Sequence, residues 1–207
     1  MRTIVGLPWW CFFLLAAGLA LFASFCFDAE AQVWIAEHQS ASLRNFMRGV
    51  SRFGDWPEHV ILGLTLLVLA YWRRNKKWRR IFAAMILACA LAGAAARVIK
   101  ISTGRARPSV QTEAGWNGPR FSPRYNAFPS GHTAASTAFF ATLALASWRI
   151  GLGFLAIPLL IAFSRMYVAA HYLSDVVCAA LIGLVTAYCL VRWIPPTIRS
   201  PQSEIRN

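Results

Sequence analysis

The chain of 207 residues has room for one domain of ordinary size. Hydrophobic residues make up 57% of it and charged residues only 14%, whereas a soluble domain is about a quarter charged, so the composition excludes an ordinary soluble protein. The net charge of +13 does not indicate a nucleic-acid partner, because six of the 21 basic residues crowd the segment 73–80 between apolar runs and no nucleic-acid-binding module accompanies them.

The first apolar run, residues 4–27, is long enough to cross a bilayer as a helix. A cleavable signal peptide ending near residues 29–31 is the competing interpretation. The run is longer than an ordinary signal-peptide core, so we expect a retained span. The segment 28–56 mixes apolar and charged side chains, and we expect it to lie along the outer membrane interface.

Five more apolar runs follow, and the second of them is rich in small residues that let helices approach closely in lipid. These runs are 56–72, 81–101, 132–148, 152–170 and 171–194. A long polar loop, 102–130, separates two of them, and Pro195 and Pro196 end the last. The predicted fold is therefore all-α, a single integral membrane domain over 1–207 with six transmembrane helices and a mobile tail at 196–207.

The five cysteines all fall inside apolar runs, and none has the spacing of a paired motif. An odd number of membrane-buried thiols argues against a disulfide framework and against a zinc site.

The basic segment 73–80 is typical of a cytoplasmic loop under the positive-inside rule. Alternation then puts both termini in the cytoplasm and the segments 28–56, 102–130 and 165–172 outside. Lysine and arginine are almost evenly divided between the two sides. Five of the outer ones flank a candidate phosphate site, so their position is explained by phosphate binding and does not count against this orientation. These five are Arg97, Lys100, Arg105, Arg107 and Arg165.

Three clusters of polar residues lie at the outer ends of the predicted helices, over 100–108, 129–132 and 164–175. In the third cluster His171 and Asp175 are four residues apart, so on a helix they share one face. A carboxylate that accepts from one ring nitrogen leaves the other nitrogen unprotonated, which makes the imidazole a usable nucleophile.

Together the clusters read K-x6-RP, PSGH and SR-x5-H-x3-D, and the sequence resembles the phosphatidic acid phosphatase type 2 superfamily, which includes lipid phosphate phosphatases and vanadium haloperoxidases. The resemblance implies His171 as the nucleophile, His132 as the general acid and Asp175 as the partner of His171. It also implies an active site at the outer ends of helices 3–6. The phosphate oxygens would be held by Lys100, Arg107, Ser130, Gly131 and Arg165.

No metal and no other cofactor is expected, because three fixed cations do the neutralising that magnesium does in kinases and the outer loops lack a cluster of carboxylates. The expected partners are a lipid phosphate substrate and membrane lipids, with no obligate protein partner. The expected location is a bacterial inner membrane, with the site facing outward. One departure from many members of that family is that Ala169 and Ala170 stand where a glycine is common before the histidine.

The implied function is hydrolysis of a lipid phosphomonoester or pyrophosphate through a phosphohistidine. The candidate substrates are undecaprenyl pyrophosphate, phosphatidylglycerophosphate, phosphatidic acid and a lipid A phosphate, and the motifs do not choose among them because they contact only the phosphate. The alternative is a non-catalytic transporter or lipid-binding protein with a polar cavity. Such a protein would not need a histidine–aspartate pair facing a second histidine.

Overall fold

The computed structural model describes residues 9–110 and 115–192, and most of these residues are helical. The helices are α1 (Trp9–Cys26), α2 (Asp28–Glu37), α3 (Ala41–Phe53), α4 (Trp56–Trp72), α5 (Lys76–Thr103), α6 (Gly131–Ala146), α7 (Trp148–Phe154), α8 (Ala156–Tyr167) and α9 (Leu173–Arg192), with a 3₁₀ turn at Pro123–Tyr125. The predicted helix end at Pro195 and the tail 196–207 lie outside the described residues. An all-helical fold is confirmed for the part of the chain described.

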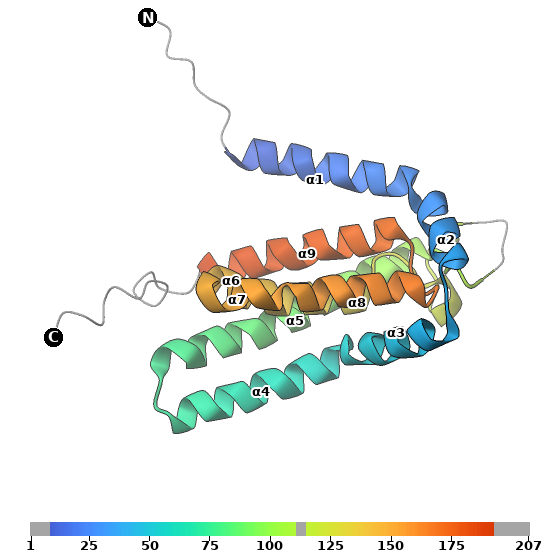
Figure 1. The fold of residues 1–207 in the computed structure, drawn as a ribbon. Coiled ribbons are helices and arrows are strands. Elements are labelled where there is room, and N and C mark those ends of the chain that lie inside the picture. The colour runs from blue at the N-terminus through green and yellow to red at the C-terminus, as the bar shows by residue number, and fades with distance from the viewer. Residues whose placement is uncertain (1–8, 111–114, 193–207) are drawn as a thin grey trace, which may run out of the picture.

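The centre of the bundle is α6, which packs between α5 and α9 and also contacts α4, α7 and α8. One of its buried contact regions with α5 and α9 consists of alanine, in a cluster of Ala88, Ala92, Ala96, Ala134, Ala138 and Ala179. Small side chains let the backbones approach closely, which is how helices associate tightly when lipid supplies no hydrophobic driving force between them. Figure 1 shows α1 and α4 on opposite sides of this centre.

Large apolar side chains cover the outer faces of the helices, as a lipid solvent requires. Phe22, Val68, Val98 and Leu159 are all more than 60% exposed, one on each of α1, α4, α5 and α8. On a soluble protein an exposed apolar surface of this extent would promote association.

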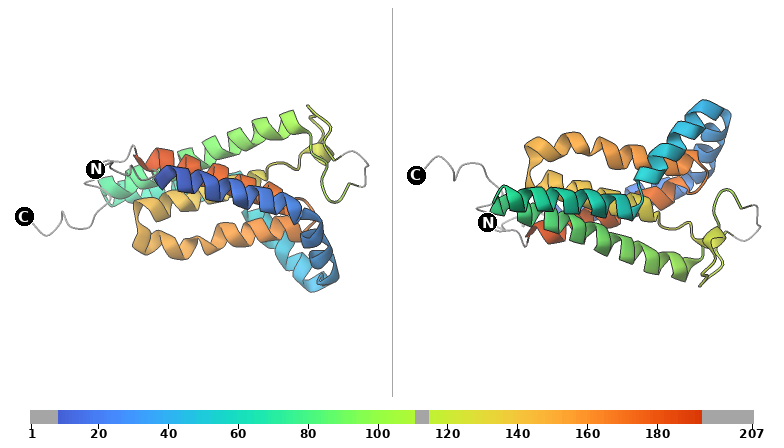
Figure 2. Two further views of the ribbon diagram at one scale, coloured as in Figure 1. Left: turned by 90° about the horizontal axis from the view of Figure 1, so that it is seen from above. Right: turned by 90° about the horizontal axis from the view of Figure 1, so that it is seen from below.

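Three segments of the described chain are long and apolar enough to cross a membrane: α5, the α7–α8 pair and α9. Two further pairs pass the same test together but bend sharply, α1 with α2 by 56° and α3 with α4 by 55°, so the count reaches five if each pair is one span. The two additional views in Figure 2 show α2 and α3 turning away from the bundle axis. At 16 residues α6 is short for a span, and the predicted number of six stays a prediction.

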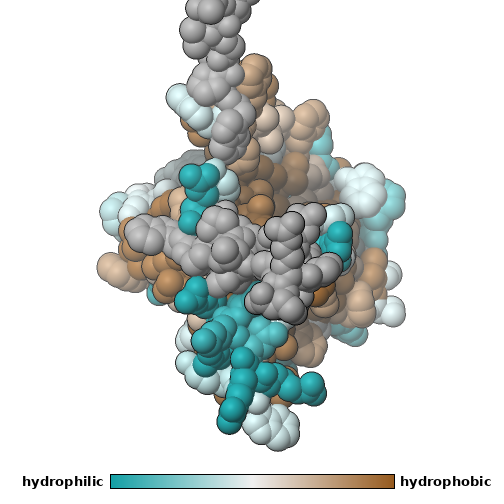
Figure 3. Space-filling model, turned by 90° about the vertical axis from the view of Figure 1, so that its left-hand side faces the viewer, coloured by the Kyte–Doolittle hydropathy of each residue, from teal (hydrophilic) through white to brown (hydrophobic). Residues whose placement is uncertain are grey.

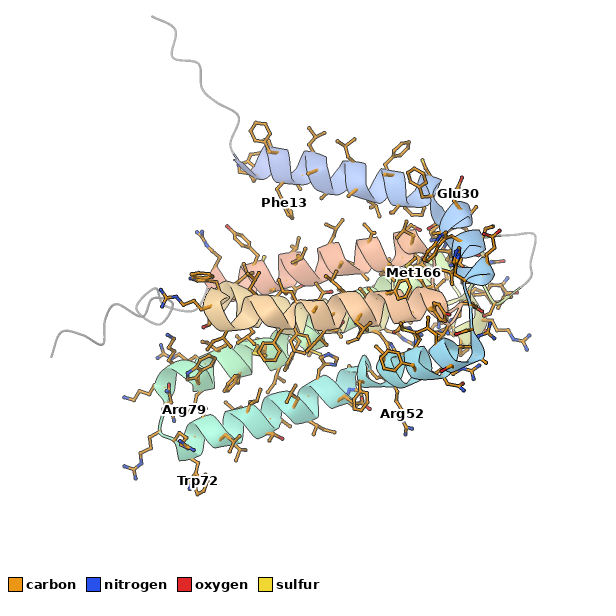
Figure 4. The ribbon with its side chains drawn as sticks, viewed as in Figure 1. Phe13, Glu30, Arg52, Trp72, Arg79 and Met166 are labelled. Atoms are coloured by element: carbon orange, nitrogen blue, oxygen red, sulfur yellow. The ribbon has the colours of Figure 1, made fainter. Side chains whose placement is uncertain are left out.

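The two ends of the bundle differ in chemistry. The segment 28–56, expected to lie along an interface, forms α2 and α3 at one end, while the α4–α5 turn lies at the other (Figure 1). The predicted loop 73–80 is shorter than expected, because Asn75 caps α5 and the helix already begins at Lys76. Figure 3 faces this end and shows hydrophilic side chains gathered at its lower edge, and Figure 4 places Trp72 and Arg79 there.

Candidate active site

The three predicted clusters meet at the end of the bundle that carries α2 and α3. Lys100 lies in the last turn of α5, His132 in the first turn of α6, and Arg165 in the last turn of α8. Their helices pack around α6, so residues far apart in sequence reach a common space. The charges of Lys100 and Arg165 act on both His132 and His171, and the charge of Arg107 also acts on His171.

A cavity of about 600 Å³ opens between α4, α5 and α6. Lys100, Gly131 and His132 form its polar part, joined by Arg97, which was expected to flank the phosphate site, and by Asp55, which was not singled out in the sequence. The remaining wall is made by Trp56, Cys89, Ala90, Gly93, Ala94 and Ala135. A lining that combines polar and apolar residues suits an amphipathic ligand whose charged group and hydrocarbon part enter together.

His171 is fully buried and lies in the turn between α8 and α9, two residues before α9 begins at Leu173. The expectation that it shares a helix with Asp175 was wrong, although the pair is close: Nδ1 of His171 is 3.5 Å from Oδ2 of Asp175. Nδ1 has no hydrogen-bond partner among the described residues. The backbone holds the turn instead, since the His171 N–H donates to the carbonyl oxygen of Arg165 at 3.2 Å.

Burial lowers the pKa of His171 well below its usual value, and the cations of Lys100, Arg165 and Arg107 lower it further. The imidazole is therefore neutral at physiological pH. A neutral ring is the form that can act as a nucleophile, because protonation would occupy the attacking lone pair.

The carboxylate of Asp175 is held from two directions. Oδ1 accepts from Nη1 of Arg105 at 2.6 Å, and Oδ2 accepts from the Tyr172 backbone N–H at 2.8 Å. The carbonyl oxygen of the same residue accepts from the Ser130 N–H at 3.1 Å, which ties α9 to the start of α6. The carboxylate is thus fixed next to His171 and linked to the PSGH cluster.

The start of α6 places Gly131 and His132 of the PSGH cluster in the cavity lining. Ser130 caps the helix, and its Oγ accepts from the Thr133 hydroxyl at 3.0 Å. A Cβ added at Gly131 would lie 3.7 Å from Nζ of Lys100, so the ammonium group lies beside this backbone. Free N–H groups at a helix start and an adjacent cation make a suitable place for an anion.

Two of the three predicted phosphate-binding cations have a buried N–H group that donates no hydrogen bond to the described residues. Nε of Arg107 and Nε of Arg165 have no hydrogen-bond partner among the described residues, while Nη1 of Arg165 donates to Oγ of Ser51. Burial lowers the pKa of Arg107, and the charge of Asp175 partly offsets the effect. Buried guanidinium donors without a partner are costly, and a multiply charged anion is the ligand that would satisfy them.

The loop after α5 depends on a glycine. Gly104 ends the helix with φ of 57°, and a Cβ there would lie 1.9 Å from the carbonyl oxygen of Gly118. The segment that follows is held on both sides, because Ala106 donates to the carbonyl of Gly115 and Arg107 to that of Arg124. The turn therefore directs the arginines of K-x6-RP toward the bundle.

Arg105, which was expected to flank the candidate phosphate site, contacts Asp175 and is not part of the cavity lining. Its guanidinium is bonded to the carboxylates of Asp28 and Asp175, both at 2.6 Å. Asp28 was not singled out in the sequence, although a carboxylate directly after an apolar run is a weak indication of a buried partner. Ala169 has φ of 54°, the backbone conformation that favours glycine.

The fold and the site define a helical membrane protein in which a buried neutral imidazole lies beside a fixed carboxylate, and in which His132, Lys100 and Arg97 line a nearby cavity. The family model of the PAP2 superfamily matches residues 80–199, which is more than half of the chain, and the chain belongs to this superfamily. The matched region contains all three motifs.

Curated relatives share parts of the sequence. A lipid A 1-phosphatase of Rhizobium johnstonii is 35% identical over 109 residues, covering 48% of this chain and 44% of the relative. An undecaprenyl-diphosphatase of Sulfolobus acidocaldarius is 28% identical over 163 residues, covering 76% of this chain and 73% of the relative. The chain thus spans less than half the length of the lipid A 1-phosphatase that it matches.

Two solved structures share the fold. LpxE of Aquifex aeolicus aligns with a TM-score of 0.58 at 21% identity, covering 80% of this chain and 95% of that structure. The PAP2 type phosphatidylglycerolphosphate phosphatase of Bacillus subtilis aligns with a TM-score of 0.61 at 21% identity, covering 89% and 92%. The helical arrangement is therefore that of known PAP2 membrane proteins.

Proposed function

We propose that the protein is a membrane lipid phosphatase that transfers the phosphoryl group to His171 and then to water. The observation that carries this proposal is the placement of a buried, neutral His171 beside Asp175 and among the charges of Lys100, Arg107 and Arg165. Phosphoryl transfer depends on holding the equatorial oxygens while an in-line nucleophile attacks, and this arrangement supplies both requirements.

In the first step Nε2 of His171 forms a bond to phosphorus, and the bond between phosphorus and the leaving oxygen breaks. Asp175 stabilises the positive charge that develops on the ring. The distance of 3.5 Å between Nδ1 and Oδ2 is long for a hydrogen bond, and such contacts commonly shorten when a substrate binds.

His132 donates the proton that the leaving oxygen needs, and then accepts a proton from the water that hydrolyses the phosphohistidine. Its position on the cavity wall beside Lys100 and Gly131 supports this role. The products are inorganic phosphate and the dephosphorylated lipid, or a lipid monophosphate when the substrate is a pyrophosphate. Metal independence is part of the proposal, with the three cations neutralising the phosphate.

The substrate is proposed from the cavity and from the relatives. The apolar residues in the cavity lining suit the hydrocarbon part of a lipid whose phosphate reaches Lys100. The names of the relatives favour lipid A 1-phosphate and undecaprenyl pyrophosphate, followed by phosphatidylglycerophosphate and phosphatidic acid. The basic α4–α5 turn at the opposite end supports an inner-membrane protein whose site faces the periplasm and whose termini are cytoplasmic.

The test is phosphate release by the purified protein in detergent from each of these four lipids. At least one lipid should be hydrolysed, with activity retained in excess EDTA and blocked by vanadate, which mimics five-coordinate phosphorus. His171→Ala should abolish release, whereas His38→Ala should not, because the His38 side chain is exposed and stacks on Trp34. No release from any of the four lipids, or activity lost in EDTA and restored by magnesium, would contradict the proposal.

A further inference from the structure

A network of buried charges connects α2 to Asp175. Asp28, the first residue of α2, is only 8% exposed, and Arg105 is 7% exposed. A buried carboxylate is costly unless it is paired, and here Oδ2 of Asp28 accepts from Nη2 of Arg105 at 2.6 Å. Because Nη1 of the same guanidinium donates to Oδ1 of Asp175 at 2.6 Å, Arg105 bridges the two carboxylates.

Ser174 completes the network at the start of α9. Its backbone N–H donates to Oδ1 of Asp28 at 2.8 Å, and its hydroxyl donates to Oδ2 at 2.6 Å while accepting from Nη1 of Arg105. The carboxylate of Asp28 therefore accepts hydrogen bonds at the N-terminus of α9, the helix that carries Asp175. Both carboxylate oxygens of Asp28 and both terminal nitrogens of the Arg105 guanidinium therefore take part in hydrogen bonds of 2.8 Å or less.

Aromatic rings enclose the guanidinium. The carbon at its centre lies 4.2 Å from the ring centroid of Tyr172, 4.9 Å from that of Trp116 and 5.4 Å from that of Phe25. These contacts exclude water and favour a cation at this position. Arg105 is thus a fixed structural cation, distinct from the cations that face the cavity.

Residues of α2 and of the segment that follows it also form hydrogen bonds with the turn that carries His171. Nε2 of Gln32, one helical turn after Asp28, donates to the carbonyl oxygen of His171 at 3.2 Å. Further along, Nε2 of Gln39 donates to the carbonyl oxygen of Tyr167 at 2.8 Å, and the Tyr167 hydroxyl donates to that of His38 at 3.2 Å. The α2 segment therefore holds both sides of the histidine–aspartate pair.

We propose that Asp28, acting through Arg105 and Ser174, is a positioning residue that sets the charge and orientation of Asp175 beside His171. Arg105 alone would neutralise the carboxylate that must stabilise a positively charged imidazole. With Asp28 present, two carboxylates share one guanidinium, so one net negative charge remains to face His171. This inference rests on the proposed function, and it gives α2 a role in the chemical step rather than in phosphate binding.

The test compares Asp28→Asn with Glu30→Gln, which makes the same change in charge on the same helix at an exposed position (Figure 4). Asp28→Asn should lower kcat by about 10- to 100-fold, by analogy with the loss seen when a residue that orients a metal-binding histidine is removed, with KM changed by less than about twofold. Asp28→Glu should recover part of the loss. Equal kcat for Asp28→Asn and Glu30→Gln would overturn the inference, as would a loss of kcat that only follows a loss of folded protein in a thermal melt.

A second readout does not need turnover. The titration of His171, followed by NMR of nitrogen-15-labelled histidine in detergent, reports the charge that faces its ring from Asp175, Lys100, Arg107 and Arg165. Removing the negative charge of Asp28 should lower the midpoint in Asp28→Asn relative to Glu30→Gln, and equal midpoints would overturn the inference. If wild type and Glu30→Gln hydrolyse none of the four lipids while the midpoints differ as expected, the proposed function is contradicted, but the effect of Asp28 on the charge beside His171 is supported.

Discussion

His132→Ala should lose activity in proportion to how poor the leaving group is. A lipid alkoxide or a sugar hydroxyl must be protonated as it departs, whereas p-nitrophenolate leaves readily as an anion. General-acid help to a poor leaving group is typically worth about 10² to 10⁴-fold. His132 is the candidate donor because it lies on the cavity wall at the start of α6.

The structure favours the lower part of that range. Lys100 lies on the same wall of the cavity, so its ammonium group can stabilise part of the charge on the departing oxygen after the histidine is removed. We expect His132→Ala to lose about 10² to 10³-fold in the first step on phosphatidic acid, which corresponds to roughly 3–4 kcal/mol. On p-nitrophenyl phosphate the first step should change by less than about tenfold.

Rapid-quench kinetics with p-nitrophenyl phosphate distinguishes the two steps. His132→Ala should release about one nitrophenol per active site in a burst and then turn over slowly, because the same histidine is the base for the water that clears the phosphohistidine. Equal losses on phosphatidic acid and p-nitrophenyl phosphate, together with the absence of a burst while vanadate still binds, would refute the reasoning.

Three other predictions address protonation, backbone strain and orientation. Because burial and nearby cations lower the pKa of His171, its ring should stay neutral as the pH falls through 6.5, and an NMR titration midpoint at or above the ordinary value for histidine, about 6.5, would contradict this. Ala169→Gly should raise thermal stability by roughly 0.5–1 kcal/mol, since a left-handed conformation costs a residue with a Cβ about 1–2 kcal/mol and glycine has a larger unfolded-state entropy. Ala170→Gly is the matched control in the same melting experiment and should destabilise; the idea fails if both changes shift the melting temperature in the same direction. A cysteine at Ser122 should react with an impermeant maleimide added outside intact cells and one at Asn75 should not, after subtraction of the signal from native thiols, and the reverse labelling would put the site in the cytoplasm.

Local patterns in the sequence were sufficient to predict the individual helices. The apolar run 56–72 coincides with α4, and the run 132–148 lies within two residues of α6 at both ends. Hydropathy could not show that α6 is the buried centre of the bundle, because alanine, serine and threonine are common both in lipid-facing and in helix-facing positions. That position depends on which helices pack against it.

The structure brings the motif residues to one end of the bundle, but their surroundings were not predictable from spacing. His171 was expected on a helix, and the structure puts it in the turn before α9, where the backbone of Arg165 holds it. The bond between Arg105 and Asp28 joins residues 77 positions apart. It forms because α2 folds across the end of the bundle, and no periodicity in a single sequence specifies that packing.

The central claim is a covalent phosphoryl group on His171, and the most direct measurement is to trap it. Wild type mixed with a lipid carrying phosphorus-32 should be quenched in alkali and denaturant, conditions under which phosphohistidine survives, and then treated with acid, which should release the label. His132→Ala should accumulate more label than wild type, because its phosphoenzyme is hydrolysed slowly, and His171→Ala should carry none. Label retained by His171→Ala, or no label on His132→Ala during measurable release of the lipid product, would contradict the account.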